Sequence, residues 1–196
     1  MIDVSWNTEE LKALHPGRVM PAIAAAVRKA GATALRDMKS EATKRVRARK
    51  RIKVGEIRKS FQLRSPRAKE IDGADWTLLV KGGRRIPLTK FPHRQTKRGV
   101  SVEINRGQRT LIKGAFVATM KSGHKGVFRR QTTKRLPIAE LLGSRPVDAL
   151  LHEGEAEAVR ERGRASFEAT FGRMLPIEFE KVAAKGRQMA SRAKKG

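Results

Sequence analysis

The stretch GAFVATMKSGHKGVFRRQTTKRLPIAELLGSRP, residues 114–146, decides the fold at the centre of the chain. Its first apolar run, residues 116–120, is rich in side chains that suit a pleated strand. A polar segment punctuated by glycines, residues 121–126, then predicts a turn. A second apolar pair follows and runs into two arginines, so the stretch predicts a hairpin and then a passage into a helix. The residues that we expect to pack in the core or against a neighbouring subunit are Phe116, Val127, Phe128, Leu136 and Ile138.

Residues 18–49 carry the pattern of an amphipathic helix. Apolar or small side chains recur at spacings of three and four, which is the period of one helix face. Pro21 suits the first turn, where its missing N–H has no acceptor to lose. An alanine-rich face around residues 22–26 allows another element to approach closely. The side chains that carry the period are Ile23, Val27, Ala30, Ala34, Met38, Ala42 and Val46.

The middle of the chain changes to short β-prone segments, and the last third returns to helix. Residues 61–64, 76–80, 100–104 and 110–112 predict strands, whereas residues 82–88 and 92–99 predict basic loops. An interrupted apolar stripe predicts a C-terminal helical region, which Pro176 should kink or break. The expected fold class is α+β, with a long N-terminal helix, a small mostly antiparallel β-sheet and a C-terminal helical region packed on the sheet. We expect residues 1–175 to form a single domain and residues 176–196 a basic helical extension with a mobile end.

The composition points to an anionic partner. Lys and Arg outnumber Asp and Glu by 45 to 19, which gives a net charge of +26. Nucleic acid is the commonest partner for such a chain, although acidic proteins and anionic membranes also attract it. Only 39% of the residues are hydrophobic and 5% aromatic, which favours a subunit that buries further surface against neighbours. There is no Cys, so disulfides and thiolate metal sites are excluded.

A dense basic segment follows the N-terminal helix. Residues 44–69 contain twelve Lys or Arg against one acid, Glu56. One interpretation is a patch that contacts phosphates, since each neutralised phosphate releases counterions. The other is a solvated helix end whose cations complement the helix dipole. The hairpin adds two more cations, and neither interpretation implies base-specific recognition. The candidate DNA-contacting residues are Lys44, Arg45, Arg47, Arg49, Lys50, Arg51, Lys53, Arg129 and Arg130.

The sequence holds none of the constellations expected of an active site. Its four histidines are scattered and lack the spacing of a metal site. The glycines do not precede a Lys-Ser/Thr pair at P-loop spacing. Glu153, Glu155, Glu157 and Glu161 are interpreted as partners of arginines on their own helix, on a solvated or inter-subunit face. We therefore expect no enzyme activity, no cofactor and no metal. We also expect no membrane span, because no window approaches the length of about 20 apolar residues that crosses a bilayer.

Several short segments, in this order, resemble one family. They are RRIPL at residues 84–88, Phe91, KRGVSV at 97–102, KGAFVA at 113–118, GVFRR at 126–130 and RLPI at 135–138. Together they resemble the phage minor tail protein Z family, also called tail-completion proteins. The family has a Gly-Pro-Ser-like turn into the C-terminal helix, and this chain has GSRP at residues 143–146. The resemblance covers about residues 18–175.

The resemblance implies a structural protein of a phage or prophage tail, acting at the head-proximal end in tail completion and head–tail joining. It implies assembly in the host cytoplasm and a place in the virion tail. The implied partners are further copies in a ring, expected to be sixfold, tail terminator or tube proteins, head–tail connector proteins, and double-stranded DNA through non-specific phosphate contacts.

The alternative is a cellular protein that binds nucleic acid independently of sequence, for which the charge alone would serve. Single-strand readers usually present aromatic rings on their sheet. Here core placement is expected for all five aromatic residues of the β-rich region, which favours the assembly protein. These residues are Phe61, Trp76, Phe91, Phe116 and Phe128.

Overall fold

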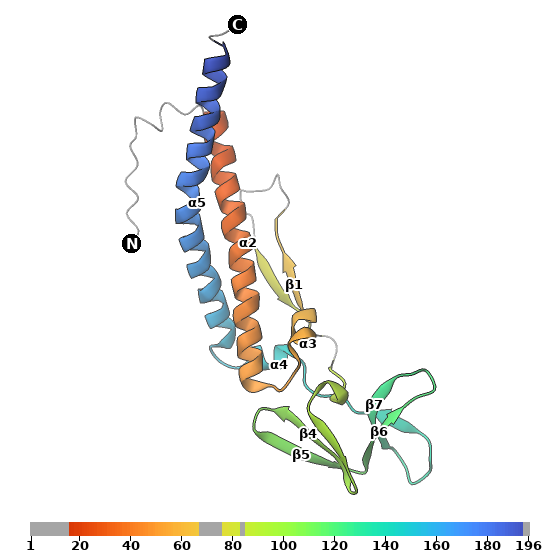
Figure 1. Ribbon diagram of the computed structural model, residues 1–196. Helices are drawn as coiled ribbons and strands as arrows, with labels where there is room; N and C mark the ends of the chain where they lie inside the picture. Colours follow the sequence, from red (N-terminus) through yellow and green to blue (C-terminus); the bar gives the residue numbers. More distant parts are fainter. Residues whose placement is uncertain (1–15, 67–75, 83–84, 194–196) are drawn as a thin grey trace. The chain divides into compact units, whose positions relative to one another are not determined.

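The computed structural model describes residues 16–66, 76–82 and 85–193, and these form two compact units. Unit 1 contains residues 16–37, 65–66, 76 and 162–193, and unit 2 contains residues 38–64, 77–82 and 85–161. Helices and small antiparallel sheets make an α+β fold, as the sequence predicts (Figure 1). Arg84 and the last residues, 194–196, lie outside the described part.

Unit 1 is built from parts of two long helices. The helix α2, Pro16–Arg49, confirms the helix predicted from residue 18 onward, and α5 spans Glu155–Ala193. Within unit 1 the two helices lie side by side (Figure 1), joined by a 2.6 Å ion pair between Lys29 Nζ and Glu178 Oε1. Buried Ala22, Ala26 and Ala30 provide the small face of α2 that the sequence indicated.

The prediction was a kink or a break at Pro176; the helix α5 continues through this residue, so a break is wrong. A proline removes one helical hydrogen bond. Contacts with α2 hold α5 on both sides of this point: Arg162 Nη2 lies 3.3 Å from Asp37 Oδ2, and Glu178 pairs with Lys29. These partly exposed ion pairs are weak by themselves, so we attribute the continuity of α5 mainly to its packing in unit 1, which includes the contact of Phe167 with Trp76.

Trp76 belongs to the helical packing of unit 1. The strand β2 begins only at Thr77, so the predicted strand is one residue too long. The Trp76 ring lies against Gly31 of α2, where a Cβ atom would overlap it. The ring also packs on Phe167 of α5, with centroids 6.0 Å apart, and Phe167 stacks on Phe171. The glycine therefore creates the space into which the indole fits.

Unit 2 contains three small antiparallel sheets, where the sequence predicted one. Three short helical segments accompany them: α3, Val54–Lys59; η1, Leu88–Lys90; and α4, Val147–Leu150. In sheet order, the strands are β1 Phe61–Arg64 and β2 Thr77–Val80; β3 His93–Thr96, β4 Gly99–Asn105 and β5 Gln108–Lys113; and β6 Ala115–Thr119, β7 Lys125–Arg130 and β8 Ile138–Glu140.

The hairpin predicted within residues 114–146 is confirmed, with Phe116 opposite Phe128 and Val117 opposite Val127 in the β6–β7 ladder. Gly123 takes a φ of +79°, which its turn requires and few other residues adopt. The passage after the hairpin differs from the prediction, because Ile138–Glu140 adds a third strand to β7 before the chain reaches α4. The helix begins after Pro146.

The strand β3 was missed, because residues 92–99 were predicted as a loop. Its sequence, HRQT, has no alternation of apolar and polar residues, which is the signal for a half-buried strand. Pairing with β4 holds it: His93 lies opposite Val102, and the Thr96 hydroxyl donates a 2.8 Å hydrogen bond to the Gly99 carbonyl. The backbone ladder thus forms a strand that the side chains do not indicate.

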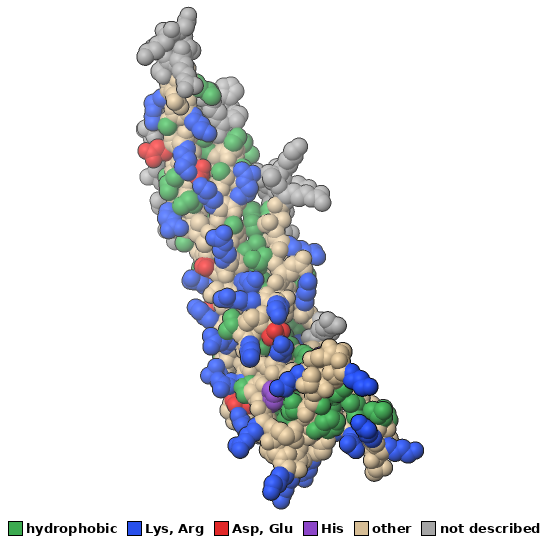
Figure 2. All heavy atoms as spheres, turned by 45° about the vertical axis from the view of Figure 1, so that its right-hand side comes forward, with side chains coloured by type: hydrophobic (Ala, Val, Ile, Leu, Met, Phe, Trp, Pro, Cys, Tyr) green, Lys and Arg blue, Asp and Glu red, His purple; other side chains and the backbone are tan. Residues whose placement is uncertain are grey.

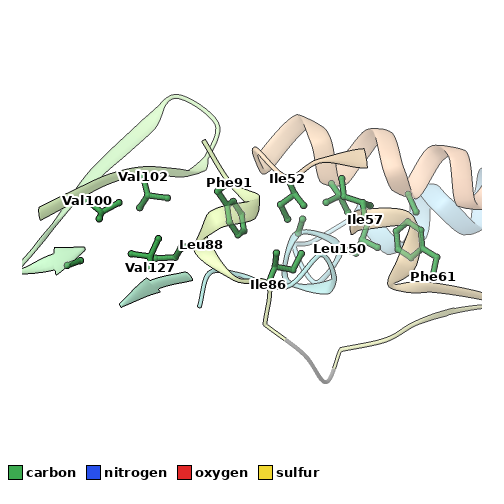
Figure 3. Packing of buried hydrophobic residues seen from close by; sticks show 14 of the residues in the cluster. Ile52, Ile57, Phe61, Ile86, Leu88, Phe91, Val100, Val102, Val127 and Leu150 are labelled. Carbon is green, nitrogen blue, oxygen red and sulfur yellow. The ribbon is translucent and has the colours of Figure 1, made fainter. Parts of the chain in front are cut away.

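The core of unit 2 is formed by the sheets, the short helices and the parts of α2 and α5 that belong to this unit (Figure 3). Phe61, Phe91 and Phe128 are buried as expected, whereas Phe116 and Trp76 are only half-buried. Among the described helices, none is long and apolar enough to cross a membrane. The largest fully buried side chains include Ile57, Leu88, Val46, Val100, Val102 and Val127.

Candidate nucleic-acid interface

The basic segment is fixed against the turn between β4 and β5. At the end of α2 the chain forms an isolated antiparallel bridge between Lys50 and Asn105. The Arg51 amide donates a 3.0 Å hydrogen bond to the Ile104 carbonyl, and the Arg106 amide donates one of 2.9 Å to the Arg49 carbonyl. These bonds bring cations from two parts of the chain, 47–53 and 106, to one place.

Two of the candidate DNA-contacting arginines form ion pairs with a carboxylate of the same chain. Arg45 Nη1 donates a 2.7 Å hydrogen bond to Glu155 Oε2, and Arg49 Nη2 lies 2.9 Å from Glu155 Oε1. The hydrogen bond from Arg45, followed by that from Arg49, holds the pKa of Glu155 below its usual value. The same contact raises the pKa of Arg45. Glu155 thus stabilises the α2–α5 junction within unit 2.

The sequence assigned Glu155 to a partner on its own helix, and this interpretation is wrong. Helical spacing correctly indicates the pair between Glu157 and Arg160, whose Oε2 and Nη1 atoms lie 2.6 Å apart. It cannot show that Glu155, in the first turn of α5, reaches the end of α2 instead. The candidate interface therefore has fewer available cations than the basic segment contains.

The remaining cations of the basic segment differ in how tightly they are held. Lys50 Nζ donates a 2.7 Å hydrogen bond to Asn105 Oδ1, and Arg51 Nε lies 3.4 Å from Glu103 Oε1. Lys44 is exposed and lies 3.9 Å from Glu41. Arg47 and Lys53 are exposed and form no ion pair within the described part of the chain, so they are the most available for an external anion.

Six cations line a cavity of about 430 Å³ in unit 2, which we call the basic cavity. They come from the basic segment, from η1 and from the β4–β5 turn, and no Asp or Glu lines it. Its apolar floor includes Ile52 and Phe91, both almost fully buried. Guanidinium and ammonium groups without a lining carboxylate favour phosphate. The six cations are Arg47, Lys50, Arg51, Lys53, Lys90 and Arg106.

Lys90 and Arg106 were not among the residues singled out in the sequence. Arg106 stands in the turn Asn105-Arg106-Gly107, where Gly107 has a φ of +77°. That turn signal was readable, but its closeness to Arg47 depends on the pairing of distant segments. The Arg106 Nε atom donates a 3.2 Å hydrogen bond to the Arg47 carbonyl, which fixes the direction of its guanidinium group.

Arg129 and Arg130 are exposed at the end of β7 and do not line the basic cavity. The structure therefore does not gather all the candidate cations into one site. Figure 2 shows Lys and Arg side chains spread over much of the described face in view, with few Asp or Glu between them. A dispersed positive surface of this kind suits non-specific attraction of a polyanion.

The candidate packing residues also separate into two groups. Val127 is fully buried and Phe128 is 5% exposed, so both belong to the core of unit 2. Phe116 and Ile138 are half-buried. Leu136 is 66% exposed and lies outside the core of this chain. Of the five residues, Leu136 therefore has the most surface left for a contact with another subunit.

Among the described residues, no group of three or more His, Asp or Glu side chains is placed to hold a metal ion. A family model described as prophage minor tail protein Z (GPZ) matches residues 6–170. No curated protein and no solved structure matches the chain.

Proposed function

The chain belongs to the prophage minor tail protein Z family, and from this premise we propose that it acts in tail completion at the head-proximal end of the tail. The match spans residues 6–170 and thus includes α2, the β-rich centre and the first part of α5. The protein is a phage minor tail protein. Its proposed role is to prepare the finished tail for joining to the head.

The proposed mechanism is assembly and electrostatic contact, without catalysis. In this proposal copies of the chain form a ring, sixfold by expectation, around the channel that carries DNA. The ring contacts tail terminator or tube proteins on one side and head–tail connector proteins on the other. The modest hydrophobic content and the exposed Leu136 support a subunit that buries more surface in an assembly.

The observation that carries the DNA contact is the basic cavity, with six cations and no lining acid in a chain of net charge +26. Phosphate contacts fix a protein on DNA without reading its sequence. Contacts of this kind suit a channel protein, because any part of the genome has to pass it. The contact should therefore weaken steeply as salt rises.

The proposal is tested with phage or prophage particles that lack this protein. Tails without it should reach normal length but fail to join DNA-filled heads, and adding the purified protein should restore joining. Electron microscopy of particles with a labelled protein should place the label at the head-proximal end of the tail. Label elsewhere on the tail, or normal infectious particles without the protein, would overturn the proposed role.

A further inference from the structure

A second cavity, of about 380 Å³, adjoins the basic cavity in unit 2. Lys53, Thr89 and Lys90 line both, and Lys125 and His124 from the β6–β7 hairpin complete the second. No Asp or Glu lines it either. We refer to the two together as the paired cavities. They connect the basic segment to the hairpin through two shared lysines.

The carboxylates nearest to the paired cavities form ion pairs with neighbouring Lys and Arg side chains, but they do not cancel the positive charge of the cavity lining. Glu56 Oε1 lies 3.1 Å from Lys59 Nζ and 3.9 Å from Lys90 Nζ, so its closer partner is Lys59. Glu103 is shared between Arg51 and Arg109. Glu140 Oε1 lies 2.9 Å from Nε2 of His124, which lines the second cavity. These three carboxylates stand outside the lining and are outnumbered by the Lys and Arg side chains that line the paired cavities.

We propose that the paired cavities bind two consecutive phosphate groups of one DNA strand, one in each cavity, with Lys53 and Lys90 between them. The inference rests on the DNA contact in the proposed function and names the site of that contact. A free anion needs only one cavity. Two adjoining cavities with shared lysines suit a chain of phosphates, because each ammonium group has three N–H donors and can reach two neighbours.

The same geometry argues against base recognition. Phe91 is 3% exposed and Ile52 is 5% exposed, so the floor offers no open ring face on which a base can stack. Arg106 is oriented by its hydrogen bond to the Arg47 carbonyl, which leaves its terminal N–H groups for phosphate oxygens. The basic cavity is therefore suited to phosphate contacts, which do not depend on the base sequence.

The test compares two double variants that remove equal charge from the chain of residues 1–196. K53Q/K90Q changes the shared lysines, and K121Q/K134Q changes two exposed lysines outside the paired cavities. Affinity for a fluorescent DNA duplex of arbitrary sequence is measured over a series of salt concentrations. The salt slope is the steepness with which the logarithm of the binding constant falls with the logarithm of the salt concentration. Each lost phosphate contact reduces this steepness by about 0.9. At 0.1 M salt this corresponds to about eightfold weaker binding, if binding at 1 M salt is unchanged.

We expect K53Q/K90Q to lower the slope by about 2, and K121Q/K134Q to change it less. The variant K53R/K90R keeps both positive charges and should bind the duplex as the wild type does. Nuclear magnetic resonance should show duplex-induced shifts at Thr89, His93 and Gly123, and inorganic phosphate should perturb the same amides, with sodium chloride as the control. A melting temperature of each variant equal to that of the wild type excludes a folding defect as the cause of weaker binding.

Unchanged duplex binding by K53Q/K90Q would overturn the paired cavities as the site and leave the DNA contact of the proposed function standing. If the wild-type protein bound no duplex even at low salt, both would fail. Shifts with inorganic phosphate but none with duplex would identify a small-anion site and also overturn the inference.

Discussion

Nη1 of Arg45 donates a 2.7 Å hydrogen bond to Oε2 of Glu155, joining residues that lie 110 positions apart. Arg49 binds the other carboxylate oxygen, and the Glu155 side chain is only 15% exposed. Two cations that a charge count assigns to DNA therefore pair with a carboxylate within unit 2. Available cations such as Arg47 have no such carboxylate partner in the described chain.

Glu155→Gln should lower the free energy of unfolding by about 1 kcal/mol, because it weakens two charge-assisted hydrogen bonds that are partly screened by solvent. Urea unfolding at neutral pH measures the change. Glu157→Gln is the matched control, since it alters an exposed ion pair on the same helix. That control should change stability by less than about 0.5 kcal/mol. Equal effects of the two substitutions would contradict a structural role for the Glu155 pairs.

The stabilisation by Glu155 should depend on pH. Hydrogen bonds from Arg45 and then Arg49 lower the pKa of Glu155 in the folded protein. A lowered carboxylate pKa stabilises the fold above the unfolded pKa of about 4.3 and loses this effect as pH falls through the folded pKa. The difference in unfolding free energy between wild type and Glu155→Gln should therefore be full at pH 6 and shrink at about pH 4 and below. A constant difference over this range would contradict the prediction.

Arg45 and Arg47 should separate stability from DNA binding. Arg47→Gln removes an exposed cation of the basic cavity and should weaken duplex binding by about eightfold at 0.1 M salt, if one phosphate contact is lost. Arg45→Gln removes the same charge from an internal pair, so it should cost stability and affect binding less. Fluorescence anisotropy and urea unfolding of both variants provide the comparison. The reverse ranking would place Arg45 in the interface.

Regular patterns in the sequence predicted the elements that depend on local periodicity. The apolar spacing from Ile23 to Val46 predicted α2, and the apolar runs around Phe116 and Phe128 predicted β6 and β7. The strand β3 was not predictable from side chains, because its backbone ladder with β4 stabilises a polar sequence. The division into three sheets likewise depends on which strands pair, which local patterns do not determine.

The candidate site was predicted only in part, because its cavity is formed by distant segments. Charge density directed attention to residues 44–53, and Arg47 and Lys53 from this segment line the basic cavity. The contributions of Lys90 and Arg106 require the folded positions of η1 and of the β4–β5 turn. Arg45 and Arg49 are less available to DNA because both form ion pairs with Glu155, and these pairs join positions that are distant in the sequence.

Phe128 and Leu136 should distinguish folding from assembly. Phe128→Ala should destabilise the chain by about 3–5 kcal/mol, because it leaves a cavity in the core. Leu136→Ala should change stability by less than about 0.5 kcal/mol, since the side chain is 66% exposed. If Leu136 packs against another subunit, as proposed, sedimentation should show weaker association of Leu136→Ala. Unchanged association would exclude Leu136 from the subunit contact.

Gly31→Ala should destabilise the protein although alanine favours helix over glycine. The added Cβ would overlap the Trp76 ring, which packs against Gly31 and Phe167, and overpacking of this kind costs about 1–3 kcal/mol. Gly172→Ala is the matched control, because Gly172 lies inside α5 with open space at its Cβ position and should gain up to about 1 kcal/mol. Urea unfolding of both variants should show a lower free energy of unfolding for Gly31→Ala and a higher one for Gly172→Ala, each relative to the wild type. If Gly31→Ala stabilised the protein as much as Gly172→Ala, Trp76 would not be seated against α2 in solution.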